Sequence, residues 1–502
     1  MPVQSSIQSV PPEVLARIFV FCAPATSRSH PREGGRLRCV SDIKQTPWTF
    51  GYVCSRWRTI SLSATELWTH IYVDISTLVQ KGEESAKSLL ETYLSRSGSR
   101  LLSVHITFDE ETPRTIESAL TILLSSSVRW RRLSILLPES ALHFFHSITH
   151  NFPNLQQFDL QLLDDMEENE ITAEEFGSFL DNAPQLQTVS IGDGFNDYLP
   201  LFVQMPILPW SQLLDFEIYE NADPFNSARY ILEACPQVQH MHLPTGSSYE
   251  CAGAPVVHRH LRSLSLKCRA GQILPPDLFD LLDLLTLPAL EVLTLESNGF
   301  GSDLNFDNTE HPSALESLIT RSSCLRLRLR VESAFISDVT SFLLFLEMTP
   351  SLQSLEFRPS TPYTMASHPD GFIIDDFVDR MRYIPQADQL CLLPNLRTLL
   401  LEDAHYFEDD DAFASMVESR WRLPGQGHSQ AVVRIEEVSL VLDREMDAAA
   451  LKRLKEMREE GLDVRVWTRM SMDAKVRTGD EEYLIYTPGL PSLDLVPVLP
   501  SA

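Results

Sequence analysis

The most pointed chemical feature of the sequence is an octapeptide, CLRLRLRV, at positions 324–331. Apolar and basic residues alternate strictly, and successive side chains of a β-strand point to opposite faces. The alternation therefore predicts three guanidiniums in one row, from Arg326, Arg328 and Arg330. Such a row could grip an acidic or phosphorylated peptide. The alternative is that outward-facing carboxylates on neighbouring strands, Glu296 and Glu356, neutralise the arginines by cross-strand pairing.

Histidines form a second group, whose chemistry could be metal binding. His240 and His242 lie near Cys235 and Cys251, and imidazole and thiolate are zinc ligands. In the register of the repeats, however, both histidines face outward on a sheet, where a partner could contact them. A further set shares one predicted helix face without an acid or cysteine at ligand spacing: His143, His146 and His150. We therefore expect no metal and no cofactor, and count His240 and His242 with the arginines as candidate substrate-binding residues.

The sequence carries none of the common catalytic motifs. GxxxxGK[ST], HExxH and GxSxG are absent, which leaves nucleotide-binding, zincin and nucleophile-elbow interpretations without support. Acidic runs at 164–170 and 408–411 follow predicted strands, and we interpret them as solvated loops, with a basic partner as the alternative. We expect a non-catalytic protein.

Composition indicates a folded, acidic protein. The 502 residues include 41 Lys and Arg against 69 Asp and Glu, a net charge of −28, and 43% are hydrophobic. Because phosphate binding needs clustered basic residues, the charge argues against nucleic acid or an anionic membrane as partner. The N-terminus lacks the basic and apolar regions of a signal peptide, and the eight cysteines form no disulfide-scaffold pattern. These features predict a cytoplasmic or nuclear location.

The arginine and histidine segments belong to a recurring phrase, Pro-x-φ-x-x-φ-x-φ, where φ is apolar. Proline-led copies begin at 153, 184, 236, 288, 350 and 394, and copies without proline at 101, 130, 213, 261, 324 and 435. Together with WTHIYV at 68, the starts recur about every 31 residues, with helical segments between them. A single strand–helix unit cannot bury its apolar face, but stacked units share a core. We predict an α/β protein in which 67–470 form an irregular leucine-rich-repeat-like solenoid, followed by a flexible, proline-containing tail at 471–502.

The segment at 7–66 has a different pattern. IQSVPPEVLARIFVF, at 7–21, predicts a short helix opened by Pro11 and Pro12. WTFGYVCSRWRTISLS, at 48–63, predicts a second apolar helix, and the Pro-, Gly- and Arg-rich stretch at 23–47 predicts a loop between them. Helices this short bury little surface alone, so we expect them to lean on a neighbour or a partner.

In order and content these segments resemble the F-box, especially the fungal kind. The family pattern Leu-Pro-x-Glu-Leu/Val-Leu-x-x-Ile-Phe is matched by VPPEVLARIF, and Val-Cys-x-x-Trp-Arg-x-Ile by VCSRWRTI. Leu67–Trp68 matches the Leu-Trp that closes many fungal members, whereas the 23–47 segment replaces the family's short connection. The resemblance implies a helical F-box at 7–66 whose contacts with a Skp-type adaptor are made by Val10, Pro11, Glu13, Val14, Leu15, Ile18, Phe19, Val53, Cys54, Trp57 and Ile60.

The same resemblance implies a function. The protein would be the substrate-recruiting subunit of an SCF-type (cullin–RING) ubiquitin ligase, reaching the cullin scaffold through the adaptor while the solenoid binds a protein substrate. The alternative is a ligase-independent leucine-rich-repeat scaffold for protein–protein interaction, in which the N-terminal helices merely cap the repeats.

Overall fold

The computed structural model describes the parts of the chain that follow: 7–23, 39–108, 117–138, 151–163, 180, 182–192, 208–219, 231–245, 255–268, 281–297, 313–324, 327–332, 343–344, 346–347, 349–358, 375–385, 391–401, 409–423, 432–442 and 444–468. Two compact units are distinguished by their contacts. Among the described residues, the first contains 7–213 and the second contains 214–468. The predicted tail at 471–502 lies outside the described residues.

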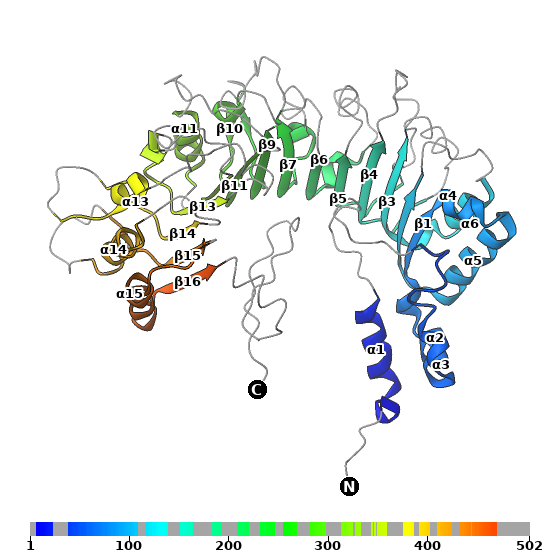
Figure 1. Cartoon of the computed structure of the whole chain (residues 1–502). Coiled ribbons are helices and arrows are strands. Elements are labelled where there is room, and N and C mark those ends of the chain that lie inside the picture. Colours follow the sequence, from blue (N-terminus) through cyan, green and yellow to red (C-terminus); the bar gives the residue numbers. More distant parts are fainter. Residues whose placement is uncertain are drawn as a thin grey trace, which may run out of the picture. The chain divides into compact units, whose positions relative to one another are not determined.

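The first unit opens with short helices and continues with strands and flanking helices (Figure 1). The opening elements are η1 (Ile7–Ser9), α1 (Pro12–Cys22), α2 (Phe50–Val53), α3 (Ser55–Ser63) and η2 (Thr65–Trp68). They are followed by β1 (His70–Asp74), α4 (Ile75–Gln80), α5 (Glu83–Arg96), β2 (Leu102–Thr107), α6 (Glu117–Leu124), η4 (Ser127–Arg129), β3 (Trp130–Pro138), β4 (Gln157–Leu163), β5 (Thr188–Gly192) and η6 (Trp210–Gln212).

The second unit repeats the strand-and-helix arrangement. Its strands in the main sheet are β6 (Asp215–Tyr219), β7 (His240–Thr245), β9 (Ser263–Cys268), β11 (Val292–Ser297), β12 (Arg328–Glu332), β13 (Ser354–Arg358), β14 (Thr398–Leu401), β15 (Glu437–Leu442) and β16 (Asp463–Thr468). A small parallel pair joins β8 (Val256–Val257) to β10 (Leu285–Thr286). The described helices are α11 (Ser313–Ser322), α13 (Asp375–Met381), α14 (Asp410–Trp421) and α15 (Ala448–Glu459).

Strand order confirms the predicted repeats. Within each unit, neighbouring strands follow the order of the chain, β1 to β5 in the first and β6 to β16, without β8 and β10, in the second. The strands pair in parallel and in matching register; for example, Phe158 of β4 is opposite Val189 of β5. Every phrase start found in the sequence leads into one of these strands. Each unit therefore has the α/β arrangement of a leucine-rich-repeat-like solenoid.

The phrase folds this way because its first apolar residue closes a turn. The N–H of Leu155 donates to the carbonyl of Phe152, and that of Val238 donates to Cys235, both at 3.1 Å. Both closing side chains are fully buried. The next two apolar residues of each phrase lie on the helix-covered face of the sheet, and the intervening polar residues lie on the opposite face. Helices α4 to α6 flank the first strands in Figure 1, and α14 and α15 flank the last.

The described part of the array ends with a capped helix, α15, and the strand β16. Asp447 accepts hydrogen bonds from the N–H groups of Ala449 and Ala450 at the start of α15, and Gly461, with φ of 106°, follows its end.

Within the described residues, no helix has the length and apolarity needed to cross a bilayer.

Part of the predicted 23–47 loop packs against the sheet. Val40 is 1% exposed, and its N–H donates to the carbonyl of Tyr72 on β1 at 2.8 Å. Val40 therefore lies against the edge of the first strand, a non-local contact that composition alone did not indicate.

Candidate functional site

The N-terminal helices form a small module with its own aromatic core. In this helical module, consisting of 7–22 and 48–68, Phe19 stacks on Phe50 with ring centroids 4.4 Å apart and contacts Trp57 at 4.7 Å. Leu15 and Ile60 are also buried. Of the residues that the F-box resemblance assigns to adaptor contact, Leu15, Phe19 and Ile60 are thus covered by the module itself, and Trp57 is half-buried.

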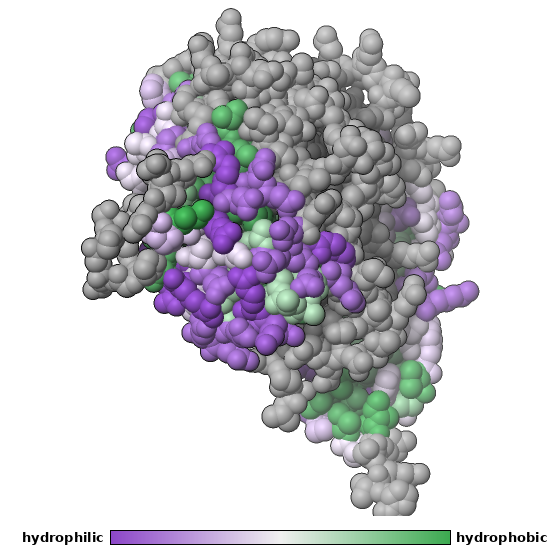
Figure 2. Space-filling model, turned by 60° about the vertical axis from the view of Figure 1, so that its left-hand side comes forward, coloured by the Kyte–Doolittle hydropathy of each residue, from purple (hydrophilic) through white to green (hydrophobic). Residues whose placement is uncertain are grey.

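Large apolar side chains remain exposed on the same helices. The exposed apolar group consists of Val14 (47% exposed), Ile18 (43%), Phe21 (83%), Tyr52 (64%) and Val53 (60%). Figure 2 shows hydrophobic atoms gathered at the lower right of its view, where the helical module lies. The motif match pointed to Val14, Ile18 and Val53 but not to Phe21 or Tyr52. Spacings of four and three residues align Val14, Ile18 and Phe21 on one side of α1, a signal that could have identified Phe21.

Hydrogen bonds cap one helix of the module and join its two segments. The Cys54 thiol accepts from the N–H of Trp57 and caps α3, and the Arg56 guanidinium donates to the carbonyls of Ile7 and Val10. Cys54 therefore has a structural role, although it is also exposed. Two further residues of the predicted adaptor contact, Pro11 and Glu13, are exposed at the start of α1.

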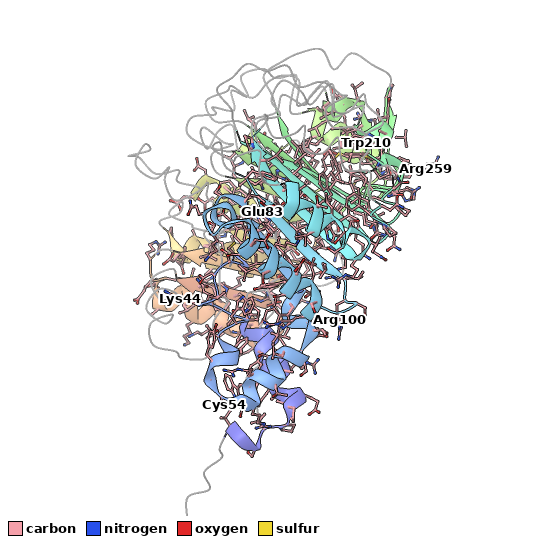
Figure 3. The ribbon with its side chains drawn as sticks, turned by 90° about the vertical axis from the view of Figure 1, so that its right-hand side faces the viewer. Lys44, Cys54, Glu83, Arg100, Trp210 and Arg259 are labelled. Carbon is pink, nitrogen blue, oxygen red and sulfur yellow. The ribbon has the colours of Figure 1, made fainter. Side chains whose placement is uncertain are left out.

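An aromatic cluster fastens the module to the first repeats. Trp48 and Trp68 pack edge to face at 5.2 Å, and Tyr93 of α5 contacts both rings. The Arg96 guanidinium lies 4.7 Å from the Trp48 ring centroid and 4.4 Å from that of Trp68. Burial raises the pKa of Tyr93. In Figure 3, Cys54 marks the module at the lower end of the ribbon, and Glu83 marks the start of α5 above it.

The polar face of the first unit's sheet carries a second candidate site. Register places five side chains in one row across β1 to β5, which we call the first-unit polar row: Tyr72, His105, Ser134, Asp159 and Ser190. Ser134 donates to Oδ2 of Asp159 at 2.9 Å, and the Tyr72 and His105 rings lie 5.1 Å apart. Within the described part of the chain, the buried Oδ1 of Asp159 and Nε2 of His105 have no hydrogen-bond partner.

Burial disfavours charge in this row. It raises the pKa of Asp159 to about 6, against a smaller lowering by the Ser134 hydrogen bond. It also lowers the pKa of His105 to about 4, so the imidazole is neutral at pH 7. No pattern in the sequence distinguished either residue, because both occupy positions of the phrase that alternation predicts to be exposed.

Arg330, one of the three arginines predicted to form a row, is neutralised by a carboxylate. Nε of Arg330 lies 2.6 Å from Oε2 of Glu356 on the adjacent strand, and the two side chains are only 15% and 4% exposed. This is the cross-strand pairing that the sequence left open as an alternative. Arg328 is opposite Ser354 and half-buried, and Arg326 lies outside the described residues.

The two histidines of β7 lie on the polar face, as the register predicted. His240 is exposed, and its Nε2 lies 4.0 Å from Asp215 of β6; His242 is half-buried one row further along. Cys235 is instead fully buried in the preceding turn, where burial raises its pKa to about 12. Cys251 and the histidines at 143–150 lie outside the described residues. In the parts of the chain that the structure describes, no group of three or more His, Cys, Asp and Glu residues could hold a metal ion.

The prediction of a solvated loop at 408–411 is wrong for the described residues 409–411. Asp409 caps α14 by accepting from the N–H of Ala412, because the free N–H groups of a first turn favour carboxylates there. Burial would raise the pKa of Asp410, but hydrogen bonds from Arg444 and the N–H of Asp447 lower it overall. A cavity of about 450 Å³ is lined by Asp375, Asp409, Asp410, Asp411 and Asp447. The front of Figure 2 is correspondingly hydrophilic.

The second predicted acidic loop, at 164–170, lies outside the described residues.

Comparisons with known proteins give little further information. No model of a protein family matches the chain, and no curated protein matches it. Among solved structures it is similar to the crystal structure of the leucine-rich repeat-containing protein LegL7 from Legionella pneumophila, at 12% sequence identity and a TM-score of 0.35, with 72% of this chain and 100% of that chain covered. The repeat architecture itself rests on the register of this chain's own strands.

Proposed function

We propose that the chain is a non-catalytic, substrate-recruiting subunit of a cullin–RING ubiquitin ligase. The helical module would dock a Skp-type adaptor, and the repeats would hold the protein to be modified. The ligase assignment comes from the F-box resemblance of the sequence. The physical support is a parallel-sheet repeat array, a fold suited to protein interaction, joined to a module with an unpartnered apolar surface.

One observation carries the docking half of this proposal. The helical module already fills its core with Leu15, Phe19 and Phe50, yet it exposes Ile18 and Phe21 on its first helix. A self-sufficient cap would turn such side chains inward, because burying each one stabilises by about 1.5–3 kcal/mol. A partner that covers the exposed apolar group gains that stabilisation at the interface.

The attachment of the module suits a recruiting subunit. The Trp48, Trp68 and Arg96 cluster and the Val40–Tyr72 hydrogen bond hold the docking helices firmly on the first repeats. A rigid connection fixes the orientation of a bound protein relative to the adaptor, which a flexible linker does not.

Adaptor capture tests the proposal. Purified Skp-type adaptor is titrated against the full chain and against Ile18→Asp, which places a carboxylate in the exposed apolar group. Ile384→Asp is the matched control, because Ile384 is 57% exposed and lies after α13. Leu15 is a poor choice because it is fully buried, and a charge there would unfold the module. We expect the chain and the control to bind and Ile18→Asp to lose binding.

The alternative is a ligase-independent interaction scaffold. It keeps the partner-binding role of the repeats and assigns the exposed apolar group to another protein. Failure of the wild-type chain to bind any Skp-type adaptor, with the repeats folded by circular dichroism, would favour it.

A further inference from the structure

The first-unit polar row contains a half-buried carboxylate, that of Asp159, which its own fold leaves half satisfied. Oδ2 of Asp159 accepts from Ser134, while Oδ1 is shielded from water and has no partner among the described residues. A buried, unpaired polar atom costs about 1–3 kcal/mol, and more when the group is charged. On β2, Nε2 of His105 is likewise buried and unpartnered in the described structure.

The second unit shows how this fold completes such a carboxylate. On β13, Glu356 is paired with Arg330 of the preceding strand at 2.6 Å, and the two are opposite each other in register. Asp159 of β4 is opposite Ser134 of its preceding strand in the same way. Serine therefore stands where the second unit has arginine, and its neutral side chain leaves the Asp159 carboxylate without an internal cation.

A cation satisfies this position better than a neutral donor does. A neutral donor would leave a net negative charge in a poorly hydrated site, whereas a paired charge gains a stronger, charge-assisted hydrogen bond. The net charge of −28 also attracts cationic partners over a distance.

We infer that the first-unit polar row captures the recruited protein through an extended segment whose lysine or arginine side chain pairs with Asp159. A hydrogen-bonding group of the same segment would meet His105, two strands away. Adjacent strands lie about 4.8 Å apart and an extended chain advances about 3.3 Å per residue, so the two groups would be about three residues apart. The inference rests on the proposed function, because it names the class of protein segment that the repeats recruit.

Selection from peptide pools tests the inference. Degenerate dodecapeptides with one central position fixed as Lys, Arg, norleucine or Glu are passed over immobilised full-length chain at moderate salt. We expect the Lys and Arg pools to be retained about tenfold more than the norleucine pool, because a charged hydrogen bond contributes that much. Equal retention of all pools, or preference for the Glu pool, would overturn the inference.

Two variants address the mechanism from opposite directions. Asp159→Asn removes the charge without changing shape, and Ser134→Arg supplies an internal cation in the manner of Arg330. Both should abolish the preference for basic pools. Asp215→Asn is the control, since Asp215 is an exposed carboxylate on the polar face of the second unit, and it should keep the preference. A preference that survives in Asp159→Asn, or that Asp215→Asn loses equally, contradicts the inference; should Ser134→Arg not fold, the isosteric variant decides.

Adaptor capture, measured on the same variants, separates this inference from the proposed function. Asp159→Asn should bind the adaptor normally, and Ile18→Asp should select basic peptides normally. Loss of peptide preference with intact adaptor binding is specific to the polar row, whereas failure of adaptor binding alone concerns the ligase assignment.

Discussion

Asp159 and Glu356 occupy matching places in the two units, but the residue opposite each on the preceding strand differs. Each carboxylate lies on the polar face of a parallel sheet, opposite a residue of the preceding strand. In the second unit that residue is Arg330, which forms a close ion pair. In the first unit it is Ser134, which satisfies one oxygen and leaves the other without a partner in the described structure.

The charge of Glu356 serves the fold itself, whereas the charge of Asp159 remains available to a partner. The Arg330–Glu356 pair is internally neutral and nearly dry, so it offers little to a partner. The carboxylate of Asp159 keeps its binding capacity at a cost in stability, as sites that bind ligands commonly do. Arg330, which lies on the strand that looked most like a binding site in the sequence, is therefore less available to a partner than Asp159 is.

Breaking the closed pair should have the largest effect. Glu356→Gln leaves the Arg330 guanidinium partly buried beside a neutral amide, and removing one partner of a buried pair costs about 3–5 kcal/mol. Urea unfolding, followed by circular dichroism, measures this loss. The double variant Arg330→Met/Glu356→Gln should recover most of it, and a double variant as unstable as the single one would contradict the assignment.

Neutralising the unpaired carboxylate of Asp159 should raise the stability, whereas breaking the Arg330–Glu356 pair lowers it. The folded pKa of Asp159 is about 6, above its ordinary value of 3.8, so its contribution to stability is complete below pH 4 and is lost as the pH rises through 6. Asp159→Asn should therefore raise the free energy of unfolding at pH 7.5 by about 3 kcal/mol. The gain should disappear by pH 4, and a gain independent of pH would contradict burial of the charged carboxylate as its cause.

His105 gives a second prediction for the pH dependence of the stability. Its folded pKa of about 4 lies below the ordinary 6.5, so its contribution is present above pH 6.5 and is lost as the pH falls toward 4. In the wild-type chain this trend opposes that of Asp159. The pH dependence of unfolding for Asp159→Asn, compared with that for the double variant Asp159→Asn/His105→Gln, should isolate the His105 trend.

Converting the open site into a closed one should give a smaller gain. Ser134→Arg recreates the second unit's pair and should raise the stability at pH 7.5 by about 1 kcal/mol. Ser134→Met is the control for size, and thermal unfolding of the two variants compares them. Equal melting temperatures would show that no pair had formed.

The smallest effect is expected at Arg328. Its side chain is half-buried opposite Ser354, and among the described residues it lacks the close carboxylate that Arg330 has. Arg328→Ala should change the free energy of unfolding by less than about 0.5 kcal/mol, as is usual at such positions. Arg330→Ala, measured alongside, should cost several times more, and similar losses would remove the distinction between the two arginines.

Local sequence patterns sufficed to predict the repeats. Each phrase contains the residues that determine its own structure. Its first apolar residue, such as Leu155 or Val238, closes the turn, and the apolar–polar alternation that follows forms the strand. The same patterns could not tell which polar positions of the phrase are buried or paired in the folded chain. Whether Asp159 is buried, or Arg330 paired, depends on which residue stands opposite on a strand about 25 residues away.

In the helical module, too, the sequence did not predict which residues are buried. The motif match placed residues on the right helices, but it did not separate Leu15 and Phe19, which fill the core, from Ile18, which is exposed. That division depends on how α1 packs against Phe50 and Trp57, residues that the 23–47 segment separates from it in sequence. The packing of Val40 on β1 is equally non-local.

Calorimetric titration of a purified Skp-type adaptor into the full chain is the decisive measurement of docking. We predict one adaptor bound per chain, with unchanged affinity for Ile384→Asp and Asp159→Asn and no measurable binding for a folded Ile18→Asp. The absence of binding by the wild-type chain, or equal binding by Ile18→Asp, would contradict the claim that the exposed apolar group docks an adaptor.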